Sequence, residues 1–186
     1  MEKRGGVRMI YVVDICSEDL FSLEFVSPIE DIIRKSGKSY ELIKIDEMEK
    51  IKSRDQVIIC GTGLLDDEHL LEIQRFNWIK DLGVKVLGIC AGSQIIGKVF
   101  GAEIKEELEI GFFKEEFNVE FLGILSEQEV YHLHHAYADF HELEDFEVYA
   151  GEKVAQAVKH KEKEIYGVLF HPEVRQKELV VEFIDG

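Results

Sequence analysis

The sequence contains little proline and cysteine and no long apolar run. Its 186 residues include two prolines, Pro28 and Pro172, and three cysteines, Cys16, Cys60 and Cys90. So few cysteines, too widely spaced for a CxxC metal clip, argue against a disulfide framework and predict a reducing, cytoplasmic location. No segment approaches the roughly 20 consecutive apolar residues that cross a bilayer as a helix.

Basic residues are also scarce relative to acidic ones. Lysine and arginine total 22 against 38 aspartates and glutamates, and the formal net charge is −16. Because nucleic-acid backbones and anionic membranes both bind basic surfaces, we expect no nucleic acid and no membrane among the partners. Residues 1–8 are too polar for a signal peptide and are expected to form a loose extension before one domain, residues 9–186.

Hydrophobic residues make up 46% of the chain, which is typical of a folded globular protein. Short apolar runs alternate with amphipathic segments in the amino-terminal half. They predict strands at 9–14, 40–45, 56–60 and 84–89, and helices at 27–36, 66–82 and 91–100. This alternation indicates an α/β fold with a mainly parallel sheet flanked by helices. Ser27 is expected to cap the first helix, with Pro28 in its first turn and Gly37 at its end.

The pattern changes after Gly101. Apolar segments follow one another with few helical stretches between them, which predicts a more antiparallel arrangement in the carboxy-terminal half. The expected strands are 117–121, 130–134, 146–150, 154–158 and 165–170. A short helix at 177–184 is expected to close the chain.

A cysteine flanked by glycines stands between a predicted strand and a predicted helix. Gly88-x-Cys90-x-Gly92 has the form of a nucleophile elbow, in which small neighbours leave room for a sharp turn. The amino terminus of the following helix favours the thiolate form of the cysteine. The alternative is a buried structural cysteine beside two packing glycines.

A thiolate nucleophile needs a group that moves protons and a group that orients it. His171 and Glu173 follow the last predicted strand, separated only by Pro172. Residues two apart in an extended segment point the same way, so Glu173 could orient the imidazole of His171. A chance occurrence of His-Pro-Glu is the alternative.

Together, the segments Gly88–Gln94 and Phe170–Val174 resemble the class I, triad-type glutamine amidotransferases. The likeness covers most of the chain from Met9 onward and implies that family's flavodoxin-like fold. It implies that Cys90 is the nucleophile, His171 the general base and acid, and Glu173 the orienting carboxylate. The reaction would be hydrolysis of L-glutamine, and this half-reaction would need no cofactor.

The resemblance also implies a binding site around these three residues. Amides that stabilise the oxyanion would come from Gly61, Thr62, Gly63 and Ala91. The residues that would bind glutamine are Gln94, Glu109 and Gly111. Three departures from the family pattern are Ser93 in place of a histidine, a Gly61-Thr-Gly63 loop without proline, and Tyr137 in place of an aspartate.

The length and the Glu109-Ile-Gly111 segment are similar to the stand-alone amidotransferase subunit of two-subunit GMP synthases. Since the sequence shows no P-loop, the resemblance implies that ammonia passes to a separate ATP-dependent synthetase of the ATP-pyrophosphatase type. His135 would face that partner. The alternatives are a stand-alone γ-glutamyl amide hydrolase, a catalytically silent glutamine-binding or regulatory module, and a chaperone or protease relative with a cysteine elbow.

A histidine-rich run raises the question of a metal site. His132, His134, His135 and His141 lie close to Asp139 in the sequence. If the run is a strand, His132 and His134 share one face and His135 points away. Because neither a helical HExxH motif nor a cysteine pair accompanies them, the sequence predicts no metal site.

Overall fold

A seven-stranded sheet forms the centre of the computed structural model, which describes residues 8–186. Its strand order is β2 (Tyr40–Lys44), β1 (Ile10–Asp14), β3 (Gln56–Ile59), β4 (Lys85–Ile89), β9 (Ile165–Val168), β8 (Ala157–His160) and β7 (Phe146–Ala150). The first five run parallel, and β8 and β7 are antiparallel to their neighbours. The α/β fold and its antiparallel carboxy-terminal strands are therefore confirmed. The extension expected at residues 1–8 lies outside the described residues, apart from Arg8.

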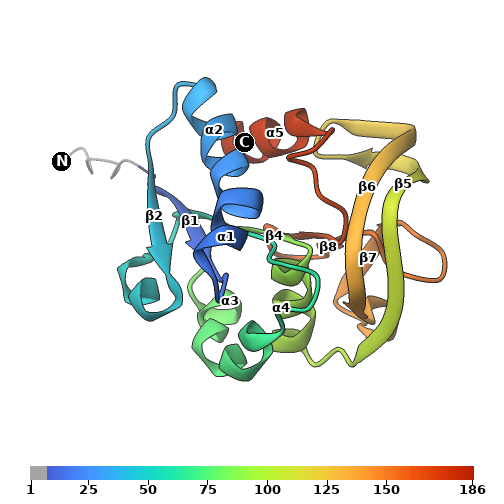
Figure 1. Ribbon diagram of the computed structural model, residues 1–186, viewed down its shortest axis with the longest axis horizontal. Coiled ribbons are helices and arrows are strands. Elements are labelled where there is room, and N and C mark those ends of the chain that lie inside the picture. Colours follow the sequence, from blue (N-terminus) through green and yellow to red (C-terminus); the bar gives the residue numbers. More distant parts are fainter. Residues whose placement is uncertain (1–7) are drawn as a thin grey trace.

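Helices cover both faces of the sheet (Figure 1). On one face lie α2 (Ser27–Lys35) and α5 (Lys177–Asp185), and on the other α3 (Trp78–Asp81) and α4 (Ala91–Phe100). Short additional turns are α1 (Asp19–Phe21), a π-helical turn at Ser22–Val26, and 3-10 helices at Ile45–Lys50, Glu68–Phe76 and Phe140–Glu142. Among the helices of residues 8–186, none has both the length and the apolar character that crossing a membrane requires.

The central strands are apolar on both faces because both faces are covered. In β1, Ile10 and Val12 pack under α2 and α5, while Tyr11 and Val13 pack toward the α3 and α4 side. Strands buried on two sides read as continuous apolar runs, which makes them recognisable in the sequence.

The start of α2 differs from the prediction. Within the described part of the chain, Ser27 makes no capping hydrogen bond, because the chain enters α2 directly from the π-helical turn Ser22–Val26. Pro28 occupies the first turn as expected. Gly37 adopts φ +76° just after the helix, a left-handed conformation that glycine tolerates best.

The single helix predicted for residues 66–82 is wrong. The carboxylate of Asp66 instead accepts hydrogen bonds from the Thr62 hydroxyl and the Ser17 amide, which holds Asp66 in a turn. The chain then winds as a 3-10 helix over Glu68–Phe76 before the short α3. Bonds between residues three apart, such as Leu70 N–H to Asp67 O, show the tighter winding.

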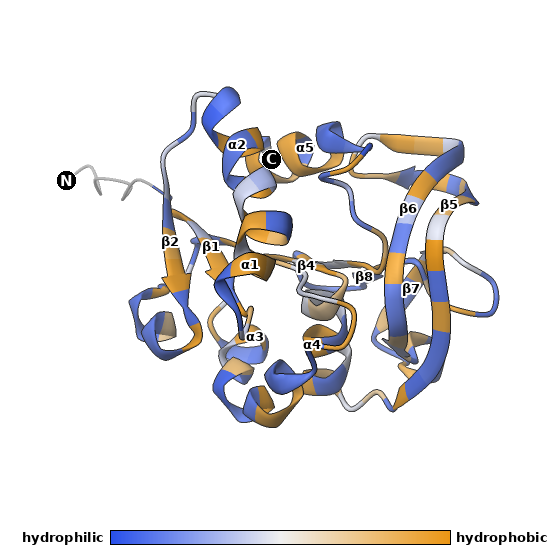
Figure 2. Cartoon of the chain, in the orientation of Figure 1, coloured by the Kyte–Doolittle hydropathy of each residue, from blue (hydrophilic) through white to orange (hydrophobic). Residues whose placement is uncertain are grey.

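The strands predicted at 117–121 and 130–134 belong to one long hairpin. Its two strands, β5 (Ile104–Phe121) and β6 (Ile124–Ala138), form a separate antiparallel sheet beside the main one. Polar and apolar residues alternate along much of this hairpin (Figure 2), and many charged residues obscure its full length in the sequence. The strand expected at 154–158 also begins later, at Ala157.

Candidate active site

Cys90 sits on a strained turn between β4 and α4. Its backbone has φ +51° and ψ −105°, which is unusual for a residue with a side chain. A β-carbon at Gly88 would lie 2.4 Å from the Gly92 carbonyl oxygen, and one at Gly92 would lie 2.2 Å from the Ile59 carbonyl oxygen. The two glycines are therefore required by close backbone contacts among β3, β4 and α4. This is the local geometry of a nucleophile elbow.

His171 lies directly beyond β9 and is paired with Glu173. Its ring Nδ1 is 2.7 Å from Oε1 of Glu173, and both side chains are buried. The backbone N–H of His171 donates to the Tyr131 carbonyl oxygen of β6 at 2.8 Å. The ring of Phe25 packs on the imidazole with 5.2 Å between centroids. These contacts fix the orientation of the imidazole.

The charge state of His171 is set by opposing effects. Burial by itself lowers the pKa of His171, but the negative charges of Glu173 and Cys90, with the hydrogen bond to Glu173, raise it well above the ordinary histidine value. The arrangement therefore favours an imidazolium beside a cysteine sulfur. Such a pair can provide both the nucleophile and the proton for a leaving group.

The loop after β3 lies beside both Cys90 and His171. A β-carbon at Gly61 would lie 2.9 Å from Cε1 of His171 and 3.4 Å from Cβ of Cys90, so only glycine fits between them. The thiol of Cys16 donates to the Gly61 carbonyl oxygen at 3.6 Å. Burial raises the pKa of Cys16 to about 12, which makes this thiol a structural donor rather than a second nucleophile.

A small hollow opens beside Cys90, and we call it the Cys90 hollow. It is lined by Thr62, Gly63, Leu64, Asp66, Asp67, His69, Cys90, Ala91, Gln94, Leu133, His134 and His135. Ala91 begins α4, and amides in the first turn of a helix have no acceptor within the helix. The residues expected to form the oxyanion site are thus gathered at one place, with Gly61 against its edge.

Gln94 lines the Cys90 hollow with both ends of its amide already bonded. Its Oε1 is 3.2 Å from Nε2 of His69, and its Nε2 donates to the Ala136 carbonyl oxygen at 2.9 Å. His69 is buried, and no sequence signal marks its role because the residue belongs to a segment that reads as an ordinary helix. The hollow itself has a volume of only about 10 Å³, roughly the space of one water molecule.

The other two residues expected to bind glutamine lie on β5. Glu109 is held by His132, His134 and Gln156 and does not line the Cys90 hollow. Gly111 pairs with His132 across the hairpin and adopts φ +117°. The alternate spacing of His132 and His134 indicates their shared face, but no pattern in the sequence specifies the register that places Glu109 opposite them.

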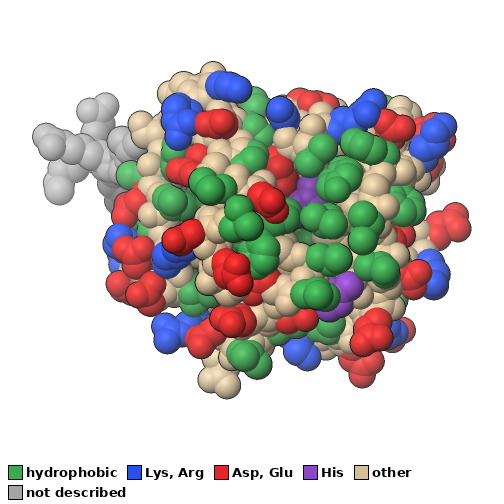
Figure 3. Space-filling model, in the orientation of Figure 1, with side chains coloured by type: hydrophobic (Ala, Val, Ile, Leu, Met, Phe, Trp, Pro, Cys, Tyr) green, Lys and Arg blue, Asp and Glu red, His purple; other side chains and the backbone are tan. Residues whose placement is uncertain are grey.

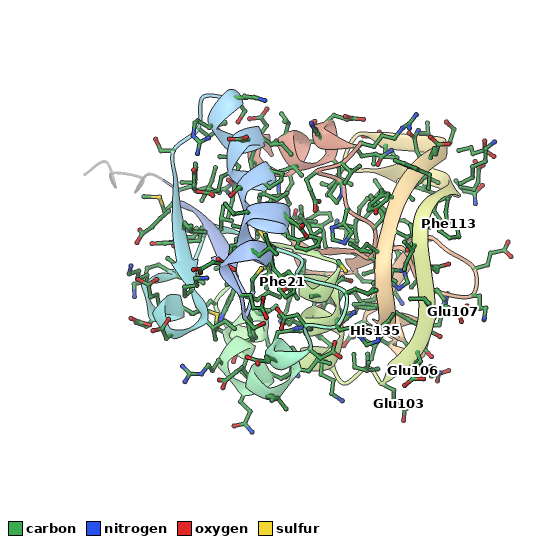
Figure 4. The ribbon with its side chains drawn as sticks, viewed as in Figure 1. Phe21, Glu103, Glu106, Glu107, Phe113 and His135 are labelled. Carbon is green, nitrogen blue, oxygen red and sulfur yellow. The ribbon has the colours of Figure 1, made fainter. Side chains whose placement is uncertain are left out.

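His135 and Leu133 form part of the hairpin side of the Cys90 hollow. Nε2 of His135 lies 3.1 Å from Oδ1 of Asp67, and its side chain is partly exposed; Figure 4 shows it on β6. The carbonyl oxygen of Leu133 is 3.6 Å from the Cys90 sulfur. A backbone carbonyl carries no signal in the sequence, so this contact could not have been predicted.

Curated proteins that are longer than this chain are similar to it in sequence. It is 31% identical over 188 aligned positions to the GMP synthase [glutamine-hydrolyzing] of Staphylococcus epidermidis, and equally to that of Staphylococcus aureus. Each alignment covers 96% of this chain but 35% of the relative. The chain therefore spans about a third of the length of these relatives.

Solved structures share the fold along nearly the whole chain. A putative GMP synthase subunit from Thermoplasma acidophilum superposes with a TM-score of 0.84 at 25% identity, covering 96% of this chain and 92% of that one. A glutamine amidotransferase from Thermotoga maritima gives a TM-score of 0.66 at 22% identity over 96% and 83% of the two chains, and shows the same fold.

A family model agrees with these relatives. The model of class I glutamine amidotransferases matches residues 21–185, a range that contains the elbow cysteine and the His171–Glu173 pair. The chain belongs to the class I glutamine amidotransferase family.

Proposed function

We propose that this protein hydrolyses L-glutamine to glutamate and ammonia through Cys90, His171 and Glu173, and delivers the ammonia to a separate ATP-dependent synthetase. The observation that carries the proposal is the strained elbow of Cys90 beside the buried His171–Glu173 pair, in which 2.7 Å separates the ring nitrogen from the carboxylate oxygen. A nucleophile, a base and an orienting group in this relation form the arrangement used for acyl transfer.

In the first half of the proposed reaction, the Cys90 thiolate attacks the side-chain amide carbon of glutamine. The carbonyl oxygen becomes an oxyanion, which amides of the Gly61-Thr62-Gly63 loop and of Ala91 would stabilise. The imidazolium of His171 gives its proton to the amide nitrogen. The carbon–nitrogen bond then breaks, ammonia leaves and a γ-glutamyl thioester remains on Cys90.

In the second half, water attacks the thioester carbon and His171 accepts the proton that the water loses. The carbon–sulfur bond breaks, glutamate forms and the Cys90 thiolate returns beside the imidazolium. Glu173 keeps the ring oriented and balances its positive charge throughout. Side chains, backbone amides and water supply every group that these two steps use.

The size of the Cys90 hollow bears on substrate entry. At about 10 Å³ it cannot hold a glutamine side chain, so its walls must move before the substrate reaches Cys90. Leu133, whose carbonyl oxygen contacts the sulfur, belongs to the hairpin wall. Substrate binding is therefore expected to depend on the position of β6.

The proposed acceptor is the ATP-pyrophosphatase subunit of GMP synthase. Support comes from the GMP synthase relatives and from the Thermoplasma acidophilum structure. Exposed apolar side chains at Leu108, Ile110 and Phe112 form a row on alternate residues of β5, each more than half exposed. Figure 3 shows apolar side chains gathered over the hairpin, which is consistent with a protein partner on that side.

The decisive experiment exposes the purified chain to an electrophilic glutamine analogue, alone and with a candidate ATP-pyrophosphatase subunit. Intact mass and peptide mapping should find a single adduct on Cys90 and none on the buried Cys60. Labelling that depends on the subunit supports the synthetase role, whereas labelling and ammonia release without it support a stand-alone amide hydrolase. Absence of an adduct in both samples would favour a silent glutamine-binding module.

A further inference from the structure

Three potential metal ligands converge on one face of the β5–β6 hairpin. A carboxylate oxygen of Glu109 and one ring nitrogen each of His132 and His134 all lie within 4.8 Å of one another. Oε2 of Glu109 is 2.9 Å from Nδ1 of His132 and 2.9 Å from Nε2 of His134. The hairpin register explains the convergence. Glu109 on β5 pairs with His134 on β6, and Gly111, two residues further along β5, pairs with His132.

The two imidazoles are buried without a full set of hydrogen bonds. His132 is 0% exposed and His134 is 2% exposed. Among the described residues, Nε2 of His132 and both ring nitrogens of His134 have no hydrogen-bond partner, although Nε2 of His134 lies close to the Glu109 carboxylate. Polar atoms buried in this way are uncommon and need an explanation.

We propose that Glu109, His132 and His134 bind one divalent transition-metal ion, with Zn²⁺ as the expected occupant. Two imidazoles and a carboxylate form a ligand set that suits Zn²⁺, and a site with three protein ligands leaves a further position for water. The ion would bind one nitrogen of each imidazole, among them the unpartnered Nε2 of His134, and would link the two strands of the hairpin.

The surroundings of the three ligands match those of a metal site. Nε2 of Gln156 donates to Oε2 of Glu109 at 2.8 Å, and Oε1 of Glu115 lies 3.5 Å from the second ring nitrogen of His132. The ring of Phe113 stacks on His132 with 4.6 Å between centroids. Groups that orient the ligands from outside are a regular feature of protein metal sites.

This proposal departs from the sequence-based expectation of no metal. That expectation depends on ligands spaced along one segment, whereas here the carboxylate comes from the facing strand, more than 20 positions away. His135 and His141, which the same run contains, are not part of the cluster. Its three ligands are distinct from Cys90, His171 and Glu173, although His134 also lines the Cys90 hollow.

Metal binding is tested first on the unmodified full chain without an affinity tag. After chelator treatment and dialysis, the chain is titrated with Co²⁺ and, in parallel, with Zn²⁺ followed by elemental analysis. We expect about one equivalent bound and visible Co²⁺ bands without the near-ultraviolet thiolate charge-transfer band. A thiolate band would place the ion on a cysteine, and absence of binding would show that Glu109 is only hydrogen-bonded; either result overturns the proposal.

Variants then locate the ion. Glu109→Gln keeps the shape of the side chain and should weaken Zn²⁺ binding at least 100-fold, as should His134→Gln. Glu115→Gln should weaken it by about 10- to 100-fold, the usual effect of losing a group that orients a ligand. His141→Gln, at an exposed histidine, and Cys90→Ala should bind as the unmodified chain does.

Two controls keep this result interpretable. Circular dichroism confirms that each variant is folded, and if the buried-histidine variant is not, Glu109→Gln and the Co²⁺ spectrum still decide the question. Unchanged binding in Glu109→Gln, or loss of binding in Cys90→Ala, would contradict the proposed site. Since neither readout uses glutamine turnover, failure of the proposed function would leave this test unaffected.

Discussion

The two walls of the Cys90 hollow are built in different ways. The sheet wall, formed by the ends of β3 and β4 and the start of α4, is held by backbone contacts so close that Gly88 and Gly92 admit no side chain. The hairpin wall, formed by β6, is held by side-chain packing and hydrogen bonds: Val130 is buried in the core, Ala138 lies against α4 at Gly97, and Gln94 donates to the Ala136 carbonyl. The sheet wall therefore fixes Cys90 through backbone contacts, whereas the hairpin wall is positioned through side chains.

The largest effect is expected from removing the proposed nucleophile on the sheet wall. Cys90→Ala should reduce glutamine hydrolysis by at least about 10⁴-fold, because loss of a nucleophile removes the covalent route. Ammonia release measured with a coupled assay, in the presence of the partner subunit if one is required, tests this. The thermal unfolding of the variant should stay close to that of the unmodified chain; glutaminase activity that survives would exclude the proposed mechanism.

A smaller loss is expected at Glu173, the residue proposed to orient the base. Glu173→Gln should lower kcat by about 10²- to 10⁴-fold with little change in KM, since the amide cannot balance the charge on His171. Steady-state kinetics measure both constants. A matched control is Glu178→Gln on α5, which should leave kcat unchanged; equal kcat values for the two variants would remove Glu173 from the mechanism.

The cost of the close contacts in the sheet wall can be measured directly. Gly92→Ala should lower the free energy of unfolding by about 1–3 kcal/mol, because the new methyl group would meet the Ile59 carbonyl. Val119→Ala, at a residue of β5 that is 62% exposed and lies outside both walls, is the control and should change it by no more than about 0.5 kcal/mol. Urea unfolding of both variants gives the comparison, and similar losses would show that the contact at Gly92 has no special cost.

The smallest effect is a pH dependence that originates at His171. Its folded pKa is raised, so the stability gained from Glu173 is fully present below the unfolded value of about 6.5 and is lost as the pH rises through the folded pKa. The difference in unfolding free energy between the unmodified chain and Glu173→Gln should therefore be larger at pH 6 than at pH 9.

Denaturant titrations at several pH values test this. A difference for Glu173→Gln that grows toward high pH would contradict the charge state inferred for His171.

Prediction from the sequence succeeds where burial on both faces leaves a plain signal. The runs at 56–60 and 84–89 indicate strands because they are largely apolar, and Gly88 and Gly92 mark the turn around Cys90. The spacing of His171 and Glu173 predicts their pairing, and the structure places them in contact. Their catalytic roles remain predictions.

Prediction fails where tertiary contacts override local patterns. Charged residues on β5 break the alternation of polar and apolar residues by which most of the hairpin could be recognised in the sequence. The hydrogen bonds accepted by Asp66 hold it in a turn, so the helix expected to begin there starts later, as a 3-10 helix. The cluster around Glu109 depends on the hairpin register, which no local pattern specifies. The pairing register of polar strands is therefore the main feature of the fold that could not be predicted from this sequence.

The hydrogen bond from the His171 amide to the Tyr131 carbonyl joins the hairpin to the end of β9, the strand that lies beside β4 in the main sheet. Cys90 and His171 therefore both follow strands of one sheet, and only the proposed proton donor is also bonded to β6 through its backbone. A displacement of the hairpin that strained this bond would act on the imidazole before it acted on the turn at Cys90. The proton donor, rather than the nucleophile, is thus the member of the proposed pair that is coupled most directly to the hairpin.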